Sequence, residues 1–200
     1  MRITKLLGIL VAAAAMFVSA AQAAKIGETA PDFKLLDIKG KEVSLGDFPD
    51  QVVVLEWVNY GCPFVKKFYN EGHMQAMQEA AKEKGVVWLS ICSSAPGNQG
   101  HMTADEWVDA AKGKGVNANV LIDEKGEVGK LYGAVTTPHM FVIDEKGVLA
   151  YNGAIDSVKS TKTADIATAK NYVVAAYESV LDGGSVESAI TKPYGCSVKY

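Results

Sequence analysis

The chain has 200 residues, a formal net charge of −3 and no block of basic residues, so nucleic acid and anionic membrane surfaces gain no support as partners. Its three cysteines are too few for a disulfide scaffold, because a chain of this length can build its own core. Their odd number leaves at least one thiol free or transiently paired, which makes redox chemistry a serious candidate.

The first residues have the layout of a secretory signal peptide. Arg2 and Lys5 precede the uncharged run LLGILVAAAAMFVSA, and AQA then supplies a small-residue cleavage site. The run is shorter than the ~20 residues that span a bilayer, which disfavours a membrane anchor. We therefore expect residues 1–23 to be removed. Residues 24–200 should then form one soluble domain, periplasmic or secreted, without a membrane contact.

The first half of the expected domain alternates between strand and helix patterns. Residues 26–51 contain short β-prone pieces broken by turn residues, which predicts an extended arm or hairpin. Residues 52–58 and 86–92 are apolar and rich in β-branched residues, as in strands buried on both faces. Between them, a helical pattern follows NYGCP and ends at Gly85, with an interruption at Gly72.

The second half continues the alternation. Thr103 and Glu106 form a capping-box signal for a helix. NVLID and MFVID are predicted strands, and VLAYNG is the expected hairpin partner of MFVID. A last helix is predicted from Ala164 to Leu181, where apolar residues recur at helical spacing, and a tail follows it. The order predicts an α/β fold with a mixed central sheet and helices on both faces, an N-terminal β-arm, and a C-terminal helix plus tail.

Cys62 is the first candidate for a reactive group. It follows a predicted buried strand, and Pro63 suits the first position of the next helix. A thiolate there would face unpaired backbone N–H groups and the positive end of the helix dipole. Lys66, one turn along, would add positive charge. Such surroundings lower the pKa of a thiol, so we interpret Cys62 as a redox nucleophile, with an inert buried cysteine as the alternative.

A second motif, TTPHMFVID, places Thr137 and Pro138 before an apolar strand. Together with GCP at a strand-to-helix junction, it resembles the thioredoxin superfamily. The arm GETAPDFKLLDIKGKEVSL is similar to the start of the alkyl hydroperoxide reductase and thiol-specific antioxidant branch, and the tail PYGCSVKY to that of a peroxiredoxin-like group with CP[F/Y]V. This resemblance covers residues 26–153. It implies a thioredoxin-like fold, and a cis Thr137–Pro138 bond against Cys62 that shapes the substrate edge.

The sequence departs from the active-site patterns of that superfamily. Val65 occupies the place of the second cysteine of a thioredoxin. Peroxiredoxins have their peroxidatic cysteine at that second place, with a threonine and a proline where this chain has Cys62 and Val58. The standard peroxiredoxin site is therefore not supported. If a peroxide is a substrate, Cys62 must meet it in a differently built pocket.

Without a local partner, a mixed disulfide at Cys62 needs another sulfur to release it. Cys92 ends a strand expected to pair with the one before Cys62, although a small core residue is the alternative interpretation. Cys196 lies in the tail KPYGCSVKY and is the favoured resolving cysteine. A structural disulfide or an intermolecular bond at Cys196 stays open.

His139 follows Pro138 and is expected near Cys62, either as a proton donor or acceptor or as a polar residue at a strand entrance. The main prediction is an exported oxidoreductase that performs thiol–disulfide exchange, or reduces a peroxide or an oxidised thiol, through Cys62. Its expected partners are a thiol or disulfide protein, or a small peroxide. No cofactor or metal motif is found, so an external reductant protein must recycle it.

Two alternatives come from other classes of function. One is a thioredoxin-fold binding module without enzymatic activity. The other is a copper carrier that uses Cys62 with His139 or Cys196. The sequence does not specify the substrate, the reductant, the direction of electron flow or the oligomeric state.

Overall fold

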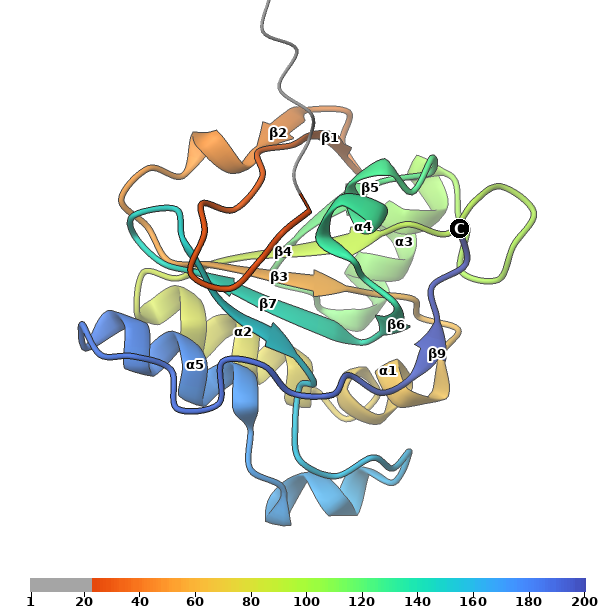
Figure 1. Cartoon of the computed structure of the whole chain (residues 1–200). Helices are drawn as coiled ribbons and strands as arrows, with labels where there is room; N and C mark the ends of the chain where they lie inside the picture. Colours follow the sequence, from red (N-terminus) through yellow and green to blue (C-terminus); the bar gives the residue numbers. More distant parts are fainter. Residues whose placement is uncertain (1–22) are drawn as a thin grey trace, which may run out of the picture.

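The computed structural model of the protein describes residues 23–200 (Figure 1). The expected signal peptide therefore lies outside the described residues, apart from Ala23 at its end. Within residues 23–200, no helix is both long and apolar enough to cross a membrane.

A mixed sheet of seven strands, in the order β2-β1-β5-β4-β3-β7-β8, forms the centre of the described chain. Strands β3, β4 and β5 run parallel to one another, and the remaining pairs are antiparallel. The strands are β1 (Lys34–Asp37), β2 (Glu42–Ser44), β3 (Val53–Trp57), β4 (Val87–Cys92), β5 (Asn119–Ile122), β7 (His139–Ile143) and β8 (Leu149–Gly153). The predicted mixed sheet and the predicted N-terminal β-arm are both confirmed.

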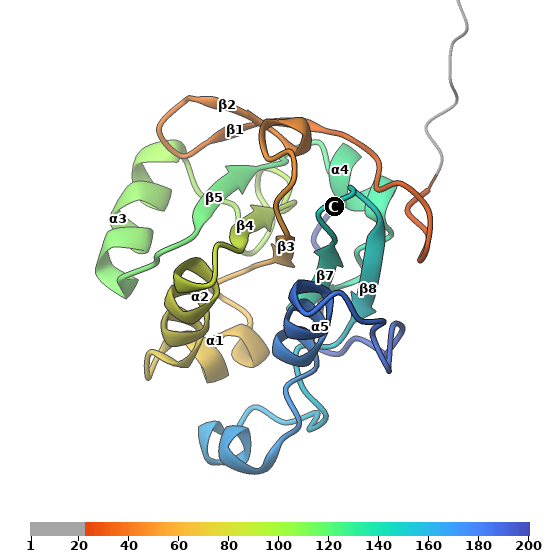
Figure 2. The same cartoon turned by 90° about the vertical axis from the view of Figure 1, so that its left-hand side faces the viewer.

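Helices cover both faces of this sheet, as predicted (Figures 1 and 2). Trp107 and Tyr177 place α3 and α5 on the face that α1 and α2 also cover. Tyr132 of α4 packs with the N-terminal arm on the opposite face. The helices are α1 (Pro63–Tyr69), α2 (His73–Glu83), α3 (Ala104–Lys114), α4 (Glu127–Tyr132) and α5 (Tyr172–Leu181). Two short 3-10 helices, η1 (Leu45–Asp47) and η2 (Thr163–Thr168), complete the set.

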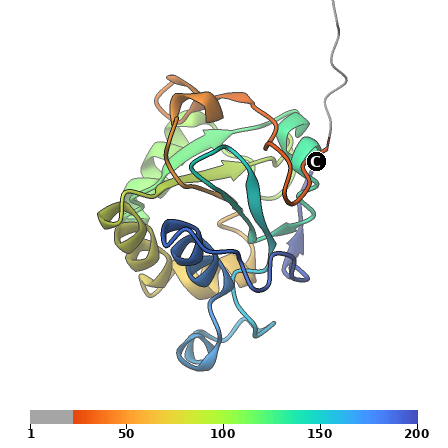
Figure 3. The ribbon, with the colours of Figure 1, turned by 60° about the vertical axis from the view of Figure 1, so that its left-hand side comes forward.

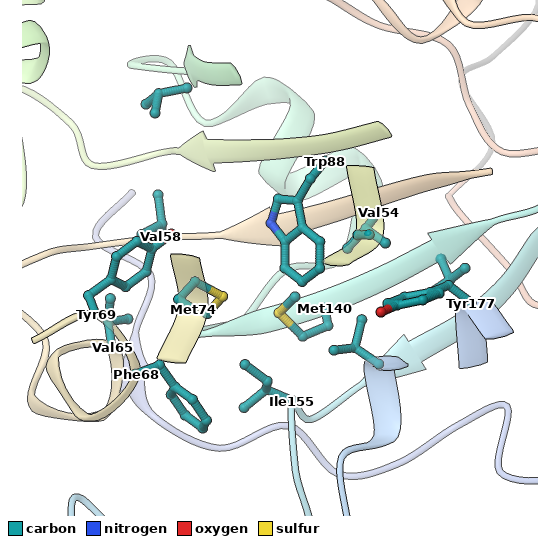
Figure 4. Close-up of a cluster of buried hydrophobic side chains, with 14 of the residues drawn as sticks. Val54, Val58, Val65, Phe68, Tyr69, Met74, Trp88, Met140, Ile155 and Tyr177 are labelled. Atoms are coloured by element: carbon teal, nitrogen blue, oxygen red, sulfur yellow. The ribbon is translucent and has the colours of Figure 1, made fainter. Parts of the chain in front are cut away.

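The core against β3 fixes the start of α1. Because side chains alternate along a strand, Val54 of β3 and Val58 just after it face the cluster that contains Val65 and Phe68 of α1 (Figure 4). Met140 of β7 lies in the same cluster. All five side chains are at most 1% exposed. This packing holds the first turn of α1 beneath the end of β3, and so fixes the position of Cys62.

The predicted single helix from Ala164 to Leu181 is wrong in its first part. Residues 163–168 form the 3-10 helix η2, and α5 begins only at Tyr172. Asn171 causes the break, because its side chain accepts a hydrogen bond from the Val174 N–H and caps α5. Capping requires Asn171 itself to be extended, which interrupts the helical pattern that the apolar spacing suggested.

After α5 the chain runs along the side of the molecule to its C-terminus (Figure 3). Near the end it forms the two-residue strand β9 (Cys196–Ser197), which pairs antiparallel with β6 (Thr136–Thr137). Figure 1 shows β9 beside β6 and close to α1. The tail therefore returns to the sheet end where Cys62 and Pro138 lie.

Glu56 of β3 is a fully buried carboxylate. Its oxygens accept hydrogen bonds from the Tyr69 hydroxyl, the Trp88 ring N–H and the Ser90 hydroxyl, each at 2.9 Å. Burial raises the pKa of Glu56, and these donors, with Gln78, oppose the rise. Donors from β4 and α1 thus converge on one acceptor and tie these elements to β3.

Replacing Ser90 by Ala should destabilise the protein by about 1–3 kcal/mol, because it removes a partner from a buried hydrogen-bonding group. The measurement is urea unfolding followed by circular dichroism, with an unchanged m-value. Ser179→Ala, which removes an exposed hydroxyl bonded to the Ser185 carbonyl, should change stability by less than about 0.5 kcal/mol. Equal effects of the two substitutions would contradict a special role for Glu56 in the core.

Candidate active site

Cys62 is the N-cap residue of α1, and Pro63 takes the first helical position as predicted. Asn59 shapes the turn that leads there: its carbonyl accepts from the Cys62 N–H at 2.9 Å, and its side chain accepts from the Gly61 N–H at 2.8 Å. Cys62 is 0% exposed. The sulfur therefore lies at the start of a helix, where unpaired N–H groups stabilise negative charge, but it is shielded from solvent.

The Thr137–Pro138 peptide bond is cis, as the resemblance implied. The carbonyl oxygen of Thr137 lies 3.1 Å from Cys62 Sγ and accepts the thiol proton when Cys62 is neutral. The Thr137 hydroxyl is buried and has no partner other than Cys62 among the described residues. The end of β6 thus forms one wall around the Cys62 sulfur.

Cys196 closes the site from the other side. In the β6–β9 pair it lies opposite Thr137, and its Sγ is 2.7 Å from Cys62 Sγ. Both cysteines are free thiols in this structure. A disulfide requires about 2.05 Å between the sulfurs, so bond formation requires only a small approach. The structure brings together Cys62, Thr137, Pro138 and Cys196, which the sequence singled out.

Gly195 allows this close approach of the tail. Its φ of +142° lies in a region that side chains other than glycine rarely adopt. A Cβ atom at this position would meet the Thr137 carbonyl oxygen at 2.1 Å. Glycine is therefore required immediately before Cys196.

The pKa values of the two thiols move in opposite directions. Burial raises the pKa of Cys62, but hydrogen bonds from the Cys196 and Thr137 side chains, and from the N–H groups of Cys196 and Val65, outweigh it and give a net lowering. Burial and the adjacent Cys62 raise the pKa of Cys196 to about 11. Cys62 therefore ionises first, and Cys196 keeps the proton that it donates to the Cys62 thiolate.

A buried ion pair that the sequence did not reveal supports the tail. Lys67 Nζ lies 2.9 Å from Asp156 Oδ2, and both side chains are at most 3% exposed. Tyr194 donates a hydrogen bond to the other oxygen of Asp156, and its ring packs on Phe64. The network links α1, the loop after β8 and the residues just before Cys196. Only the adjacent YGC pattern could have hinted that Tyr194 is an anchor.

Two predicted supporting residues lie differently from the expectation. Lys66 is exposed on α1, and the groups that lower the pKa of Cys62 are instead Cys196, Thr137 and backbone N–H groups. Cys92 is buried at the end of β4, where its sulfur contacts the Gly100 carbonyl and burial raises its pKa. Cys196, and not Cys92, is thus the cysteine that contacts Cys62.

The expectation that His139 acts beside Cys62 is corrected by the structure. Its Nδ1 accepts from the Val135 N–H, its Nε2 contacts Asn152 Oδ1 at 2.8 Å, and its ring stacks on Phe141. Phe141 belongs to the core on the sheet face opposite Cys62. Adjacent strand residues point to opposite faces, so His139 points away from the site while Met140 points toward it.

This placement also bears on the copper alternative. A site built from Cys62 and His139 is not formed, because both ring nitrogens have other partners. Across residues 23–200, no group of three or more His, Cys, Asp or Glu residues is arranged to hold a metal ion.

The AhpC/TSA family model matches residues 26–152. The chain belongs to the AhpC/TSA family. Thiol-disulfide oxidoreductase ResA of Bacillus thuringiensis is 29% identical over 145 residues, which cover 70% of this chain and 73% of the relative. Sporulation thiol-disulfide oxidoreductase A of Bacillus subtilis is 25% identical over 134 residues, or 66% and 77% of the two chains. These relatives support an oxidoreductase activity for the present AhpC/TSA protein.

Solved structures agree with the fold. A hypothetical protein of Sinorhizobium meliloti has a TM-score of 0.75 and 25% identity, over 90% of this chain and 96% of the other. A thiol:disulfide interchange protein DsbE of Chlorobium tepidum has a TM-score of 0.54 and 25% identity, over 65% and 85% of the chains. The predicted thioredoxin-like fold is confirmed. The family match itself ends at residue 152, so Cys196 lies beyond it.

Replacing Cys196 by Ala should raise the pKa of Cys62, because it removes the thiol that donates to the Cys62 thiolate. The measurement is the rate of alkylation of Cys62 by iodoacetamide as a function of pH, with the modified residue identified by mass spectrometry. The midpoint should move to higher pH, and the rate near pH 6 should fall several-fold. Cys92→Ser is the matched control and should leave the profile unchanged; an unchanged profile for Cys196→Ala would contradict the assignment.

His139 should make the fold sensitive to acid. Burial lowers its pKa to about 4 from 6.5, so the unfolded chain binds the proton more tightly. The stability it contributes is complete above about pH 6.5 and is lost as pH falls toward 4, by about 2 kcal/mol at pH 5. Unfolding by urea at pH 7.5 and pH 5 should show a smaller difference in His139→Phe. His73→Asn, a control for losing any histidine, should behave like the wild type.

Proposed function

We propose that this AhpC/TSA protein is an exported thiol–disulfide oxidoreductase with Cys62 as nucleophile and Cys196 as resolving cysteine. The observation that carries the proposal is the 2.7 Å distance between the two sulfurs. The opposite pKa changes of the two thiols support the assignment of roles. The names of the relatives add support for exchange chemistry. Export to the periplasm or beyond rests on the signal-peptide pattern of residues 1–23, with residues 24–200 as the mature domain.

The first step is attack on a substrate disulfide. The Cys62 thiolate forms a bond to one substrate sulfur, the substrate S–S bond breaks, and the second substrate sulfur leaves as a thiolate. The helix N-terminus and the donors around Cys62 stabilise its charge before the attack. Thr137 and Pro138 form the wall against which the substrate sulfur is held.

The second step releases the substrate. Cys196 loses its proton and attacks Cys62 Sγ, and the remaining substrate sulfur leaves as a thiolate that takes up the proton. The product is a Cys62–Cys196 disulfide and a fully reduced substrate. No rearrangement of the backbone is required once the tail is in place, because the two sulfurs already face each other.

An external reductant protein must then reduce this disulfide. We assign Cys196 as the sulfur that the reductant thiolate attacks, since Cys196 is partly exposed and Cys62 is fully buried. The S–S bond breaks, and Cys62 leaves as a thiolate. A second reductant thiol attacks its own sulfur in the mixed disulfide and frees Cys196. Low-pKa thiols leave faster, so the lowered pKa of Cys62 favours this order.

Reduction of a small peroxide is the second candidate. The burial of Cys62 favours it, because a buried sulfur is open only to small molecules. The Cys62 thiolate would attack one peroxide oxygen and become a sulfenic acid, the O–O bond would break, and the leaving oxygen would take up a proton from solvent as an alcohol or water. Attack by the Cys196 thiol would then form the disulfide and release water. The same external reductant would complete the cycle.

Non-reducing peptide mapping before and after mild oxidation tests the pairing. A Cys62–Cys196 disulfide should appear, and turnover of a disulfide substrate with thioredoxin as trial reductant should fall at least about 100-fold in Cys62→Ser. Cys196→Ser should accumulate a mixed disulfide at Cys62. Cys92→Ser is the matched control and should keep both the bond and the turnover.

Any of four results would contradict the proposal. A Cys62–Cys92 bond would show that Cys92, and not Cys196, is the resolving cysteine. Full turnover in Cys62→Ser would show that Cys62 is not the nucleophile. Stoichiometric binding of Cu(I) by the reduced protein, without any exchange activity, would favour a copper carrier that uses Cys62 and Cys196, and an unreactive Cys62 would favour a binding module.

A further inference from the structure

Cys196, two residues after Tyr194, lies directly against Cys62. We call residues 194–200 the C-terminal strap. Its N-terminal anchor is Tyr194, buried against Phe64 and bonded to Asp156. Its centre, β9, pairs with β6 and covers the Cys62 sulfur. A nucleophile with no exposed surface cannot reach the disulfide of a folded protein, so the position of the strap decides which substrates meet it.

The far end of the strap is held by Tyr200. Its hydroxyl donates to the Ala134 carbonyl at 2.6 Å, and Lys130 Nζ lies 5.3 Å from its ring centroid. Next to it, the Ala95 N–H donates to the Lys199 carbonyl at 2.8 Å, and the Val198 N–H donates to the Val135 carbonyl at 3.1 Å. Asn98 Nδ2 also donates to the Lys199 carbonyl at 3.2 Å, and no buried ion pair like that of Lys67 and Asp156 is recorded at this end among the described residues.

Gly129 provides the space for the Tyr200 ring. It lies inside the short helix α4, where glycine costs about 0.5–1 kcal/mol relative to alanine. A Cβ atom at Gly129 would lie 2.5 Å from the Tyr200 hydroxyl, 2.7 Å from its ring and 2.8 Å from the Ser93 hydroxyl. A Cβ atom at Gly126 would also meet this ring, at 2.3 Å. The glycines therefore form a notch that fits the last side chain of the chain.

We propose that Tyr200, seated in the Gly126–Gly129 notch, is a specificity-determining residue that controls the size of the substrate that reaches Cys62. With the strap latched, only small oxidants reach the sulfur. Protein disulfides reach it when Tyr200 leaves the notch and β9 separates from β6, with Tyr194 as the hinge that keeps Cys196 close. This inference rests on the proposed role of Cys62 as nucleophile.

The test compares two thiol reagents on the full chain in a Cys196→Ser background, where serine preserves the shape of the strap. Cys62 is treated with iodoacetamide, which is small, and with a maleimide that carries a polyethylene glycol chain, which is bulky. Tyr200→Ala removes the latch, and Gly129→Ala fills the notch. Each substitution should raise the rate of Cys62 labelling by the bulky reagent, relative to the rate with the small reagent, by roughly tenfold. The reason is that each removes the hydrogen bond of Tyr200 and the packing of its ring, which lowers the free energy of strap docking.

Gly113→Ala is the matched control, because Gly113 also lies in a helix and a Cβ atom there would meet nothing within 4 Å. It should leave the ratio unchanged. Amide hydrogen exchange supplies a readout without thiol chemistry: the Val198 N–H should exchange faster in Tyr200→Ala and Gly129→Ala. Unchanged circular dichroism and thermal midpoint show that each variant is folded.

The outcomes separate this inference from the proposed function. Fast labelling of Cys62 by the bulky reagent in every variant, the control included, would overturn the latch and leave Cys62 as the nucleophile. Failure of both reagents to label Cys62 in every variant, although the Val198 N–H exchanges faster, would overturn both proposals. An equal increase in the control would also overturn the latch.

Discussion

The geometry of the site depends on the buried ion pair between Lys67 and Asp156. Two unpaired charges in this position would be very costly, and they are tolerated because each is matched and hydrogen-bonded. Asp156 also accepts from Tyr194, so the same carboxylate that holds α1 holds the start of the tail. The helix that begins at Cys62 and the tail that carries Cys196 are therefore positioned against one group. This network therefore acts together with the core packing of α1 and the β6–β9 pairing to bring the two sulfurs together.

The second constraint on the site is that β3 and β7 are paired neighbours in the sheet. Because β3 and β7 are antiparallel, the end of β3 lies beside the beginning of β7, with Trp57 opposite His139. The turn after β3 leads to Cys62, and Thr137 and Pro138 directly precede β7, so Cys62 and Thr137, which are 75 positions apart, meet at one sheet end. The alternation of β7 then turns Met140 toward Cys62 and His139 to the other face. The position beside Pro138 thus contributes a buried neutral ring to the fold and no proton to the sulfur.

Local pattern was enough for much of this structure. Continuous runs of apolar residues predict buried strands such as β3 and β4, and the proline after Cys62 predicts the start of α1. The cis bond before Pro138 followed from resemblance. His139 was misplaced because its proximity to Pro138 in sequence was taken as proximity in space, whereas strand alternation decides the face. The last helix was predicted too long because the cap at Asn171 overrides the apolar spacing.

The tail shows where local pattern fails. Lys66 and Lys67 are adjacent lysines, yet one is exposed and the other is fully buried, and only the position of Asp156 distinguishes them. Strand β9 has two residues, too few for any periodic signal. The fit of Tyr200 depends on glycines more than 70 positions away. These features come from tertiary contacts that composition and spacing do not encode. Cys196 was singled out from its place in a tail, and its sulfur lies 2.7 Å from Cys62 Sγ.

In the proposed mechanism the resolving cysteine lies 134 residues from the nucleophile, so its delivery differs physically from that of a cysteine in the same helical turn. In a CxxC motif the helix presents both sulfurs, so their effective concentration is fixed by covalent geometry. Here it depends on how well the C-terminal strap docks. Weaker docking would expose Cys62 to large substrates, but it would lower the effective concentration of Cys196 and so slow release of the substrate from the mixed disulfide. Tighter docking would speed that release but keep large substrates away from Cys62. The proposed strap meets both requirements, because Tyr194 is anchored to the buried Asp156 and would keep Cys196 near while the end held by Tyr200 opened.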